Sequence, residues 1–311
     1  MICVKYIKKM KIGCHINCYD ETTAELKIDQ AIYSAIEIGA NALQFMVSSP
    51  NNATPGPPIR NAKELQTIIK NTGIYVVIHG KYTINFCRKG VQWQHQAMVI
   101  DLRKANKLGP DVGVVLHQGK NLDSLHQTRE EARQTFVSEV EKVLSATADI
   151  SNPIILENSC HQGTEIGYSL DELAEIWGLF KNESRKRLGF CLDTCHVFVA
   201  GDLQMKDHDD VDQWFQRFDS LIGLKYLKLI HFNDSNVKFN GHNDNHDDIG
   251  QGYITNPTKG GNPNGLSRVV AWAKTYEIPL ILEVPGECTE QIELLNSWAN
   301  EAPIITLPKT K

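Results

Sequence analysis

The sequence PIILEN, at residues 153–158, is a short apolar run that ends in a carboxylate and an amide. Runs of this kind recur along the chain, and apolar runs of this length bounded by Gly, Pro or Asn are typical of strands that are buried on both faces. The eight runs are Lys11–Ile16, Ala42–Val47, Ile74–His79, Val112–His117, Pro153–Asn158, Leu188–Asp193, Leu227–Phe232 and Pro279–Val284. We therefore predict eight buried strands, distributed over the whole chain.

Helix-length stretches separate these runs. Apolar residues at three-to-four spacing form one stripe over residues 136–144 and another over 170–180, and Ser169 with Glu172 three residues later resembles a capping box. Strands that alternate with helices predict a parallel sheet of the α/β class. Eight such strands without a linker favour a closed (β/α)8 TIM barrel over an open doubly wound sheet. No G-x-G-x-x-G follows the first run, which weakens a dinucleotide-binding alternative.

The pattern predicts a single barrel domain over residues 11–311, preceded by an N-terminal extension at residues 1–10. One stretch, Asp234–Gly265, fits this scheme poorly because it is too long for an ordinary strand-to-helix loop. It is rich in Asn, Gly and Asp, and an irregular segment of this length is usually functional or mobile.

The composition excludes several classes of protein. With 41% apolar and 22% charged residues, this chain of 311 residues is neither disordered, collagen-like nor a coiled coil. Its net charge of −5 disfavours DNA binding through a sequence-wide basic field, but it leaves a local phosphate site open. The apolar runs are too short to span a membrane, and the basic first eleven residues lack the apolar core of a secretory signal.

Eight cysteines are too few in a chain of this length for a disulfide scaffold. We therefore expect a reduced, intracellular protein, either cytoplasmic or nuclear. Cys14 and Cys18 could still form a bridge under oxidation, because spacing alone does not fix their geometry. Cys160, Cys191 and Cys195 lie near candidate carboxylates, but without a C-x-x-C motif we expect them to be buried packing residues rather than ligands.

Seven predicted strands have a histidine, aspartate or glutamate as their last or second-to-last residue. These residues are His15, His79, His117, Glu157, Asp193, His231 and Glu283. In a barrel, the strand ends converge on one face, where the active sites of this architecture lie. A single such residue is most often a hydrogen-bonded structural group, but seven at equivalent positions would be costly to bury without a shared partner. The pattern therefore predicts a metal centre.

Two further clusters accompany the strand ends. His196 follows Asp193 in the sequence DTCH, and Asp244 and His246 stand two residues apart in the long loop, so both can point to one ion in an extended segment. The candidate ligands are then His79, His117, Glu157, Asp193, His196, His231, Asp244, His246 and Glu283. Imidazole and carboxylate together suit zinc, with manganese or iron as alternatives, and nine candidates are more than one ion needs.

The most specific stretches of the sequence are CLDTCHVFVAG at residues 191–201, LEN at 156–158, HFND at 231–234 and DNH at 244–246. On these motifs, and over nearly the whole chain, the sequence resembles the endonuclease IV family of apurinic/apyrimidinic (AP) site endonucleases. The resemblance implies a TIM barrel with three Zn²⁺ ions per chain, with Mn²⁺ as the alternative metal. Each of the family's nine ligand positions finds a chemically suitable residue here, and His15 matches a supporting residue.

Carried over to this sequence, the resemblance implies three sets of ligands, namely His79, His117 and Glu157; Glu157 again with Asp193, His231 and Glu283; and His196, Asp244 and His246. A hydroxide that bridges the first two ions would attack the phosphate 5′ to an abasic site and leave a 3′-hydroxyl and a 5′ deoxyribose phosphate. Glu157, which would bridge the two ions, and Glu283, which could orient or deprotonate the hydroxide, are the predicted catalytic residues.

The resemblance also implies a partner, namely duplex DNA that contains abasic sites, on which the protein would act in base excision repair. It further implies a monomer that has no membrane partner. Tyr82 matches a side chain that the family inserts into the duplex, and we predict that it contacts DNA. Thr83 replaces a residue that is commonly apolar, and Asn245 stands where the family usually has arginine. The loop over residues 48–52 lacks the basic residue often found there. These departures concern DNA contacts and leave all nine predicted ligands in place.

Two other functions remain open from the residues alone. A sugar isomerase or epimerase on a similar barrel would use one or two divalent ions at Glu157, Asp193, His231 and Glu283. That function would leave the other five candidate ligands without a joint role. A non-catalytic protein that binds damaged DNA, or a scaffold stabilised by metal, would have no need of a cluster that generates a nucleophile.

Overall fold

The computed structural model describes residues 9–20, 22–23 and 25–306, and these residues form a closed barrel of parallel strands. The barrel strands are β1 (Ile12–His15), β4 (Ala42–Phe45), β5 (Tyr75–His79), β6 (Val114–His117), β7 (Ile154–Glu157), β8 (Leu188–Asp193), β9 (Leu227–His231) and β12 (Leu280–Leu282). β1 pairs with both β4 and β12, which closes the sheet. Each strand lies within a predicted run, so the predicted TIM barrel is confirmed. Residues 1–8 of the predicted N-terminal extension lie outside the described residues.

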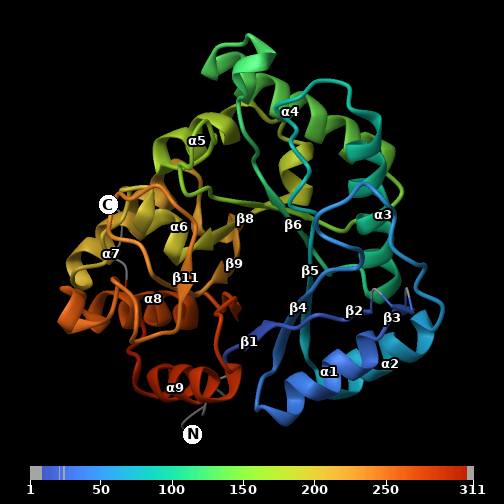
Figure 1. Ribbon diagram of the computed structural model, residues 1–311. Coiled ribbons are helices and arrows are strands. Elements are labelled where there is room, and N and C mark those ends of the chain that lie inside the picture. Colours follow the sequence, from blue (N-terminus) through green and yellow to red (C-terminus); the bar gives the residue numbers. More distant parts are fainter. Residues whose placement is uncertain (1–8, 21, 24, 307–311) are drawn as a thin grey trace, which may run out of the picture.

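Helices surround the barrel on its outside (Figure 1). They are α1 (Ile28–Glu37), α2 (Ala62–Thr72), α3 (Gln92–Leu108), α4 (Arg129–Ala146), α5 (Leu170–Leu179), α6 (Thr194–Val199), α7 (His208–Leu221), α8 (Pro263–Thr275) and α9 (Cys288–Glu301). Short 3-10 helices occur at Asp123–Leu125, Ser184–Arg187, Leu224–Tyr226 and Pro257–Lys259. Two small antiparallel pairs lie outside the barrel and consist of β2 (Tyr19–Asp20) with β3 (Glu25–Leu26), and β10 (Asp234–Ser235) with β11 (His246–Asp247).

The predicted stripes fall on α4 and α5, and their apolar residues are buried against the barrel. Ser169 accepts a hydrogen bond from the Glu172 backbone N–H, as predicted, but the Glu172 carboxylate binds Arg129 rather than returning to the cap. A complete capping box instead begins α4, between Thr128 and Glu131.

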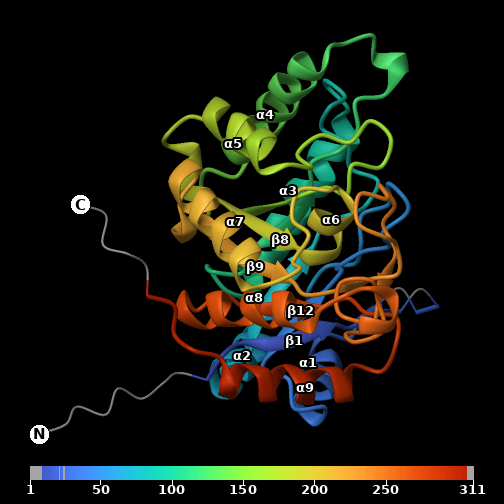
Figure 2. The same ribbon diagram turned by 90° about the vertical axis from the view of Figure 1, so that its left-hand side faces the viewer.

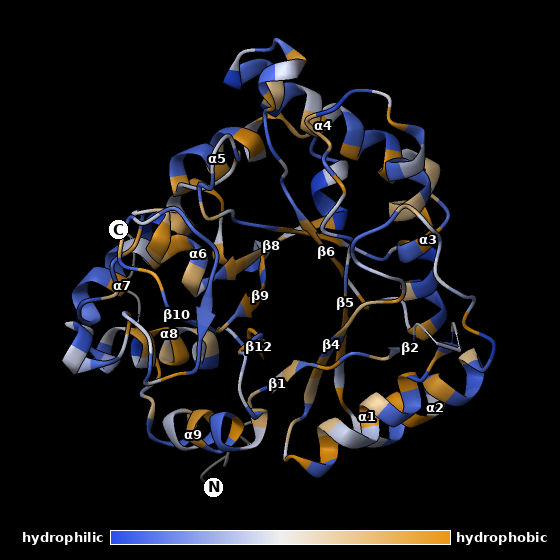
Figure 3. Ribbon diagram, viewed as in Figure 1, coloured by the Kyte–Doolittle hydropathy of each residue, from blue (hydrophilic) through white to orange (hydrophobic). Residues whose placement is uncertain are grey.

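Two apolar layers hold the barrel together. The outer layer lies between the strands and the helices, and it includes large buried side chains such as Trp272, Phe136 and Phe215. The inner layer fills the barrel itself and consists of Ala42, Val77, Val115, Ile155, Cys191, Leu229 and Ile281, one from each of seven strands. The strands are accordingly mostly orange in the hydropathy view, whereas β10 and the chain around it are mostly blue (Figure 3).

The eighth strand, β1, contributes Gly13 at this level of the barrel. Gly13 pairs with Ala42 on one side and with Ile281 on the other. A Cβ atom at Gly13 would lie 1.7 Å from the Ala42 carbonyl oxygen, so only glycine permits this close approach of β1 and β4.

The loops that follow the barrel strands gather on one side of the molecule, which is the right-hand side of Figure 2. This side is the barrel mouth, where the carboxyl ends of parallel strands meet. The long stretch Asp234–Gly265 lies there and contains β10, β11 and a 3-10 helix, so it is more ordered than a structureless loop. Among the described residues, no helix is long and apolar enough to cross a membrane.

Candidate metal centre at the barrel mouth

The alternation of side chains along each strand builds the site. Successive residues of a strand point to opposite faces, so the residue two positions after each inner-layer residue also points into the barrel. Those eight residues are His15, Gln44, His79, His117, Glu157, Asp193, His231 and Glu283. The structure therefore brings all seven predicted strand-end residues to one level at the mouth, directly above the apolar inner layer.

Glu157 lies at the centre of this ring and is almost fully buried. Its Oε2 atom lies 3.1 Å from His117 Nε2 and 3.5 Å from His79 Nε2. Its Oε1 atom lies 3.0 Å from Nδ1 of His231 and 3.5 Å from Nδ1 of His196. One carboxylate thus faces imidazoles on both of its oxygens, which is the arrangement expected of a group shared between two positive centres.

Two groups of potential ligand atoms meet at Glu157. In each group, the ligand atoms lie within 4.8 Å of one another. The first consists of His79, His117 and Glu157, and the second consists of Glu157, Asp193, His231 and Glu283. These groups coincide with two of the three ligand sets implied by the family resemblance.

The third predicted set surrounds Asp244, in the loop between β10 and β11. Its Oδ2 atom lies 3.2 Å from Nε2 of His196, and its Oδ1 atom lies 3.1 Å from Nε2 of His246. His196 stands on α6, which Asp193 caps by accepting the His196 backbone N–H at 2.8 Å. The three predicted residues therefore lie together. Two compact groups overlap with them, namely Asp193 with His196 and His246, and Cys195 with Asp244 and His246.

Hydrogen bonds orient the candidate histidines. The Nδ1 atoms of His79, His196 and His246 lie 2.7, 2.9 and 2.9 Å from the backbone carbonyl oxygens of Gly80, Asn158 and Glu283. A carbonyl oxygen only accepts, so each Nδ1 donates to it, and each Nε2 is left to face a carboxylate, where it can carry a proton or bind a metal ion. Metal-binding histidines typically donate from one ring nitrogen to such a partner.

Some buried polar atoms of the site lie close to an imidazole or a carboxylate but have no partner in hydrogen-bonding geometry. Among the described residues, they include Glu157 Oε2, His196 Nε2 and His246 Nε2. Leaving buried polar atoms unpaired is costly, and all three are potential ligand atoms in compact groups. This donor set fits divalent metal ions with a preference for imidazole and carboxylate.

The charges of the cluster shift its pKa values strongly. Burial tends to raise the pKa of Glu157, but His231 and His117 outweigh burial and hold it well below its usual value. Burial tends to lower the pKa of His196, but Asp193 and Asp244 hold it well above its usual value. For His246, the same competition gives a pKa of about 9. The carboxylates therefore need positive charge beside them, which protons or metal ions can supply.

Gln44 is a member of the ring that the strand-end pattern missed. Its Oε1 atom lies 2.8 Å from His231 Nε2, and its Nε2 atom donates to Glu283 Oε1 at 2.6 Å and lies 3.1 Å from His15 Nδ1. Its predicted run continues beyond this level in apolar residues, so inspection of strand ends could not find it. The available signal was that Gln44 is the one polar residue in the run Ala42–Val47.

A cavity of about 480 Å³ opens above the candidate ligands and is lined by His15, Tyr82, Asp244, Asn245, His246, Glu283, Val284 and Pro285. Tyr82 is 49% exposed, and its ring centroid lies 5.1 Å from that of His79 and 5.6 Å from that of His117. It therefore stands at the edge of the site, with one side free to contact a ligand. Asn245, in the place of the family's arginine, is also exposed at this mouth.

The cysteines near the site are all buried thiols. Cys191 belongs to the apolar inner layer, as expected of a packing residue. Cys195, in contrast, has its sulfur close enough to Asp244 and His246 to form one of the compact groups. Cys14 and Cys18 are both free, so no disulfide joins them in the structure.

A TIM barrel with imidazoles and carboxylates clustered at its mouth defines a class of barrel proteins with candidate metal sites. Comparisons with known proteins narrow this class to a family. A family model described as a xylose isomerase-like TIM barrel matches residues 32–259. A protein of Acanthamoeba polyphaga mimivirus that carries endonuclease 4 in its name is 32% identical over 288 residues, which cover 88% of this chain and 85% of that protein.

Two further comparisons agree. The apurinic-apyrimidinic endonuclease 1 of Saccharomyces cerevisiae is 28% identical over 91% of this chain and 74% of its own length. The crystal structure of endonuclease IV from Thermus thermophilus superposes with a TM-score of 0.76 and 25% identity, over 94% of this chain and 100% of that one. The chain belongs to the endonuclease IV family, and it is an enzyme of that hydrolase class.

Proposed function

We propose that the protein is a zinc-dependent AP endonuclease of base excision repair. It hydrolyses the phosphodiester bond 5′ to an abasic site in duplex DNA and leaves a 3′-hydroxyl and a 5′ deoxyribose phosphate. Membership of the endonuclease IV family supports this proposal, as does the name of the yeast relative, which specifies apurinic-apyrimidinic sites. The substrate, the metal and the roles of individual residues are parts of the proposal.

The observation that carries the proposal is the group at Asp244. A sugar isomerase or epimerase on this fold would need only the residues around Glu157, Asp193, His231 and Glu283. Here Asp244 also faces His196 and His246 with its two oxygens, at 3.2 and 3.1 Å. A further pair of imidazoles, His79 and His117, faces the opposite side of Glu157. Phosphodiester hydrolysis has a use for several positive centres, because both the attacking and the leaving oxygen need stabilisation.

Each residue has a proposed role. His79, His117 and Glu157 would hold one Zn²⁺; Glu157, Asp193, His231 and Glu283 a second; and His196, Asp244 and His246 a third. Divalent ions bound there supply hydroxide near neutral pH and neutralise charge on phosphate oxygens. Glu283 lines the open cavity, and its carboxylate can accept a proton from the attacking water. Tyr82, exposed at the edge of this cavity, can pack into the gap that a missing base leaves in the duplex.

The decisive experiment incubates the zinc-loaded protein with a duplex that carries a tetrahydrofuran abasic analogue. This analogue lacks the aldehyde that β-elimination requires, so a nick at its 5′ side reports hydrolysis. We expect a nick that leaves a 3′-hydroxyl, and metal analysis of the protein as purified, before zinc is added, should give close to three zinc equivalents per chain. An intact duplex after incubation with fully loaded protein would refute the proposal, and one manganese per chain would favour an isomerase.

Glu157→Gln tests the central ligand, and Glu139→Gln is its matched control. Both glutamates are buried, but Glu139 lies on α4, where it pairs with His95 at 2.7 Å and Lys142 at 2.5 Å, away from the site. We expect Glu157→Gln to lose bound zinc and cleavage together. Glu139→Gln should keep both, with lower thermal stability. Equal metal content and activity in the two variants would show that the role assigned to Glu157 is wrong.

A further inference from the structure

The long stretch Asp234–Gly265 builds a second hollow that the proposed metal centre does not use. This pocket, of about 320 Å³, lies on the mouth side of the barrel and is lined by Phe198 on α6, Lys206 before α7, and Lys238, Phe239, Tyr253 and Lys259 on the long stretch. We call these six residues the lysine–aromatic pocket. In a chain with a net charge of −5, three lysines at one hollow are a local concentration of positive charge.

Two of the three ammonium groups are available to a ligand. Lys206 and Lys238 are exposed. Among the described residues, the one acidic side chain paired with these lysines is Asp247, which lies 3.4 Å from Lys259. Near Lys206, the carboxylates of Asp207 and Asp210 are engaged with backbone N–H groups at the start of α7. The pocket can therefore bind an anion with Lys206 and Lys238.

Aromatic rings lie between the lysines. The Nζ atoms of Lys238 and Lys259 lie 5.9 and 5.2 Å from the centroid of the Tyr253 ring, which holds both ammonium groups by cation–π attraction. Phe239 is 36% exposed and packs edge-on against Phe198, at a centroid distance of 5.4 Å. Lysines that bind a phosphate backbone beside aromatic rings that accept a stacked base form the usual platform for a nucleic acid strand.

The pocket shares a wall with the candidate metal centre. Successive residues of β11 point in opposite directions, so His246 faces Asp244 while Asp247 faces Lys259 in the pocket. On α6, Phe198 follows His196 by two residues. Backbone hydrogen bonds from Asn240 N–H to the Phe198 carbonyl oxygen and from His242 N–H to the Val199 carbonyl oxygen, at 3.2 and 3.0 Å, fix the loop to α6 (Figure 1).

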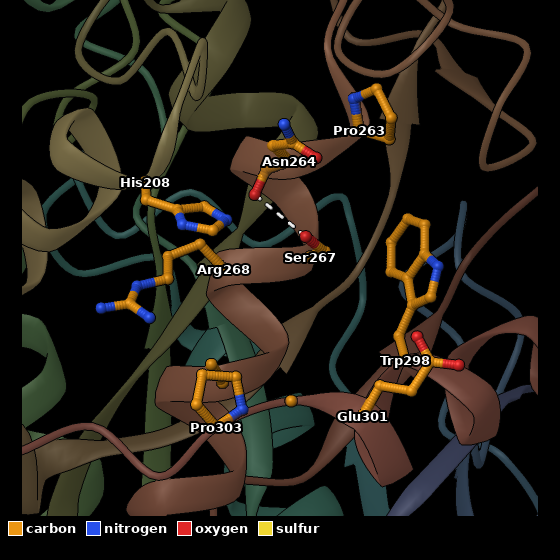
Figure 4. Close-up of a pocket in the computed structure, with 10 residues that line it drawn as sticks. His208, Pro263, Asn264, Ser267, Arg268, Trp298, Glu301 and Pro303 are labelled. Atoms are coloured by element: carbon orange, nitrogen blue, oxygen red, sulfur yellow. Dashed lines mark hydrogen bonds between the residues drawn. The ribbon is translucent and has the colours of Figure 1, made fainter.

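Another hollow of similar size serves as a comparison for the lysine–aromatic pocket, because its described lining lacks free lysines. It measures about 330 Å³ and lies between α7, α8 and α9, with Arg268, Ser267 and Trp298 in its lining (Figure 4). Its arginine is held by Asp212 through two hydrogen bonds of 2.7 Å, and among its described lining residues there is no lysine. That hollow lacks available positive charge, whereas the lysine–aromatic pocket has it next to the catalytic cavity.

We propose that the lysine–aromatic pocket binds the DNA strand that flanks the abasic site, with a backbone phosphate at Lys206 and Lys238 and a neighbouring sugar or base against Phe239. This inference rests on the proposed function, because it assigns a second contact to the same substrate. Such a contact compensates for the basic side chains that are missing at Asn245 and in the loop over residues 48–52.

The test compares kcat/KM at several salt concentrations for duplexes with the tetrahydrofuran analogue. One duplex has long flanks, and two others are trimmed to a few base pairs on one side or the other. The variants are Lys206→Gln, Lys238→Gln, the double variant and Phe239→Ala. The matched control is Lys225→Gln, because Lys225 also stacks on a tyrosine, Tyr226 at 4.9 Å, but lies before β9 at the opposite end of the barrel.

We expect each lysine substitution to reduce the dependence of log kcat/KM on log salt by about 1, with a higher KM on the long duplex. Phe239→Ala should raise KM without changing this salt dependence. Trimming one of the two flanks should abolish the difference between the variants and the wild type, and Lys225→Gln should behave like the wild type. Unchanged KM and salt dependence in Lys206→Gln and Lys238→Gln on the long duplex would overturn the inference.

A free nucleotide is the competing source of the phosphate, and thymidine 5′-monophosphate serves as its probe. If this probe binds to the wild type but not to the double variant while the DNA kinetics of the two proteins agree, the pocket takes nucleotides and the inference is wrong. Wild-type protein that leaves the long duplex intact would instead refute the proposed function. In that case, salt-dependent binding of the same duplex still tests the pocket by itself.

Discussion

Gln44 is the residue that ties the proposed metal ligands to one another. Its amide oxygen lies against His231 Nε2, and its amide nitrogen donates to Glu283. A side-chain amide can accept from an imidazole N–H with its oxygen and donate to a carboxylate from its nitrogen at the same time. The contact at His231 Nε2 leaves Nδ1 of that ring directed at Glu157 and Glu283, at 3.0 and 3.1 Å. Gln44 thereby positions two proposed ligands without being one.

We predict that Gln44→Leu lowers both zinc affinity and kcat/KM by about 10- to 100-fold, because it removes both hydrogen bonds from the ligands it orients. Zinc titration and cleavage of the tetrahydrofuran duplex measure the two effects. Gln94→Leu is the control, since Gln94 is equally buried but lies on α3, outside the site. Wild-type zinc affinity in Gln44→Leu, together with wild-type kinetics, would show that Gln44 fills space only.

At the scale of an element, the long stretch after β9 is organised around one buried carboxylate. Asp234 accepts hydrogen bonds from the backbone N–H groups of Gly250, Gly252 and Ile254 and from the Thr255 hydroxyl. It is fully buried, and burial raises its pKa. Because one side chain satisfies several donors, the segment is held in a fixed shape without a hydrophobic core of its own.

Asp234→Asn replaces one acceptor oxygen with a donor, so it leaves several of these N–H groups without a partner. We expect a loss of about 2–4 kcal/mol in the free energy of unfolding and faster hydrogen exchange at residues 250–255. Asp219→Asn is the control, because Asp219 caps a turn by accepting from Leu224 N–H. Exchange in 250–255 that is equally slow in both variants would contradict this role of Asp234.

Helix α3 carries a buried charge cluster that holds the loop after β4. Lys104 on α3 and Lys81 after β5 donate from Nζ to the carbonyl oxygens of Val47 and Ser49, at 2.9 and 2.6 Å. Asp101, one turn before Lys104, is 2% exposed. Burial raises the pKa of Asp101 to about 7 and lowers that of Lys104 to about 8. These lysines are the nearest basic groups to the loop over 47–49, but they support its backbone from inside.

The raised pKa of Asp101 makes stability depend on pH. An unfolded aspartate loses its proton near pH 4, whereas folded Asp101 keeps it until about pH 7. Between these values the folded state binds more protons, so the free energy of unfolding decreases as pH rises. We expect Asp101→Asn to show a weaker decrease than the wild type in urea titrations over this window. Asp111→Asn, at an exposed position, should follow the wild type. Parallel curves for wild type and Asp101→Asn would contradict the prediction.

At the scale of the whole molecule, the proposed metal ions change the charge balance. The chain has a net charge of −5, and four of its carboxylates, Glu157, Asp193, Asp244 and Glu283, are proposed ligands. Three divalent ions would bring the loaded protein to a charge of about +1. On the proposed function, the acidic composition describes the chain without metal, and the positive charge that attracts DNA would be concentrated at the barrel mouth.

Removal of metal should lower the stability of the whole barrel, because the proposed ligands come from strands on several sides of it, from α6 and from the loop at Asp244. Zinc at about a thousand times its dissociation constant contributes about 4 kcal/mol for one site, and for a chain of this size the loss of that site should lower Tm by about 6 °C. Differential scanning calorimetry with EDTA and after zinc is restored measures the effect. Glu157→Gln should respond much less. An identical Tm with and without EDTA would contradict metal binding by the folded state.

The fold and most of the candidate site follow from local sequence. Each barrel strand could be predicted because a short apolar run between turn residues has few alternatives. Alternation along the strand then places residues such as His117 and Glu157 inside the barrel. Gln44 was missed because its run continues with apolar residues beyond it, and the binding of Glu172 to Arg129 was missed because the two residues lie on different helices.

By itself, the sequence determined the eight-stranded barrel, the strand ends that carry imidazoles and carboxylates, and the motifs of the endonuclease IV family, because these depend on periodicity and on local order. Only the tertiary structure decided which nitrogen of each histidine faces a carboxylate, that Asp234 fixes the long stretch, and that three lysines separated by up to 53 positions share one pocket with Tyr253. Those features depend on contacts between distant segments, and the chain makes such contacts only when the barrel closes.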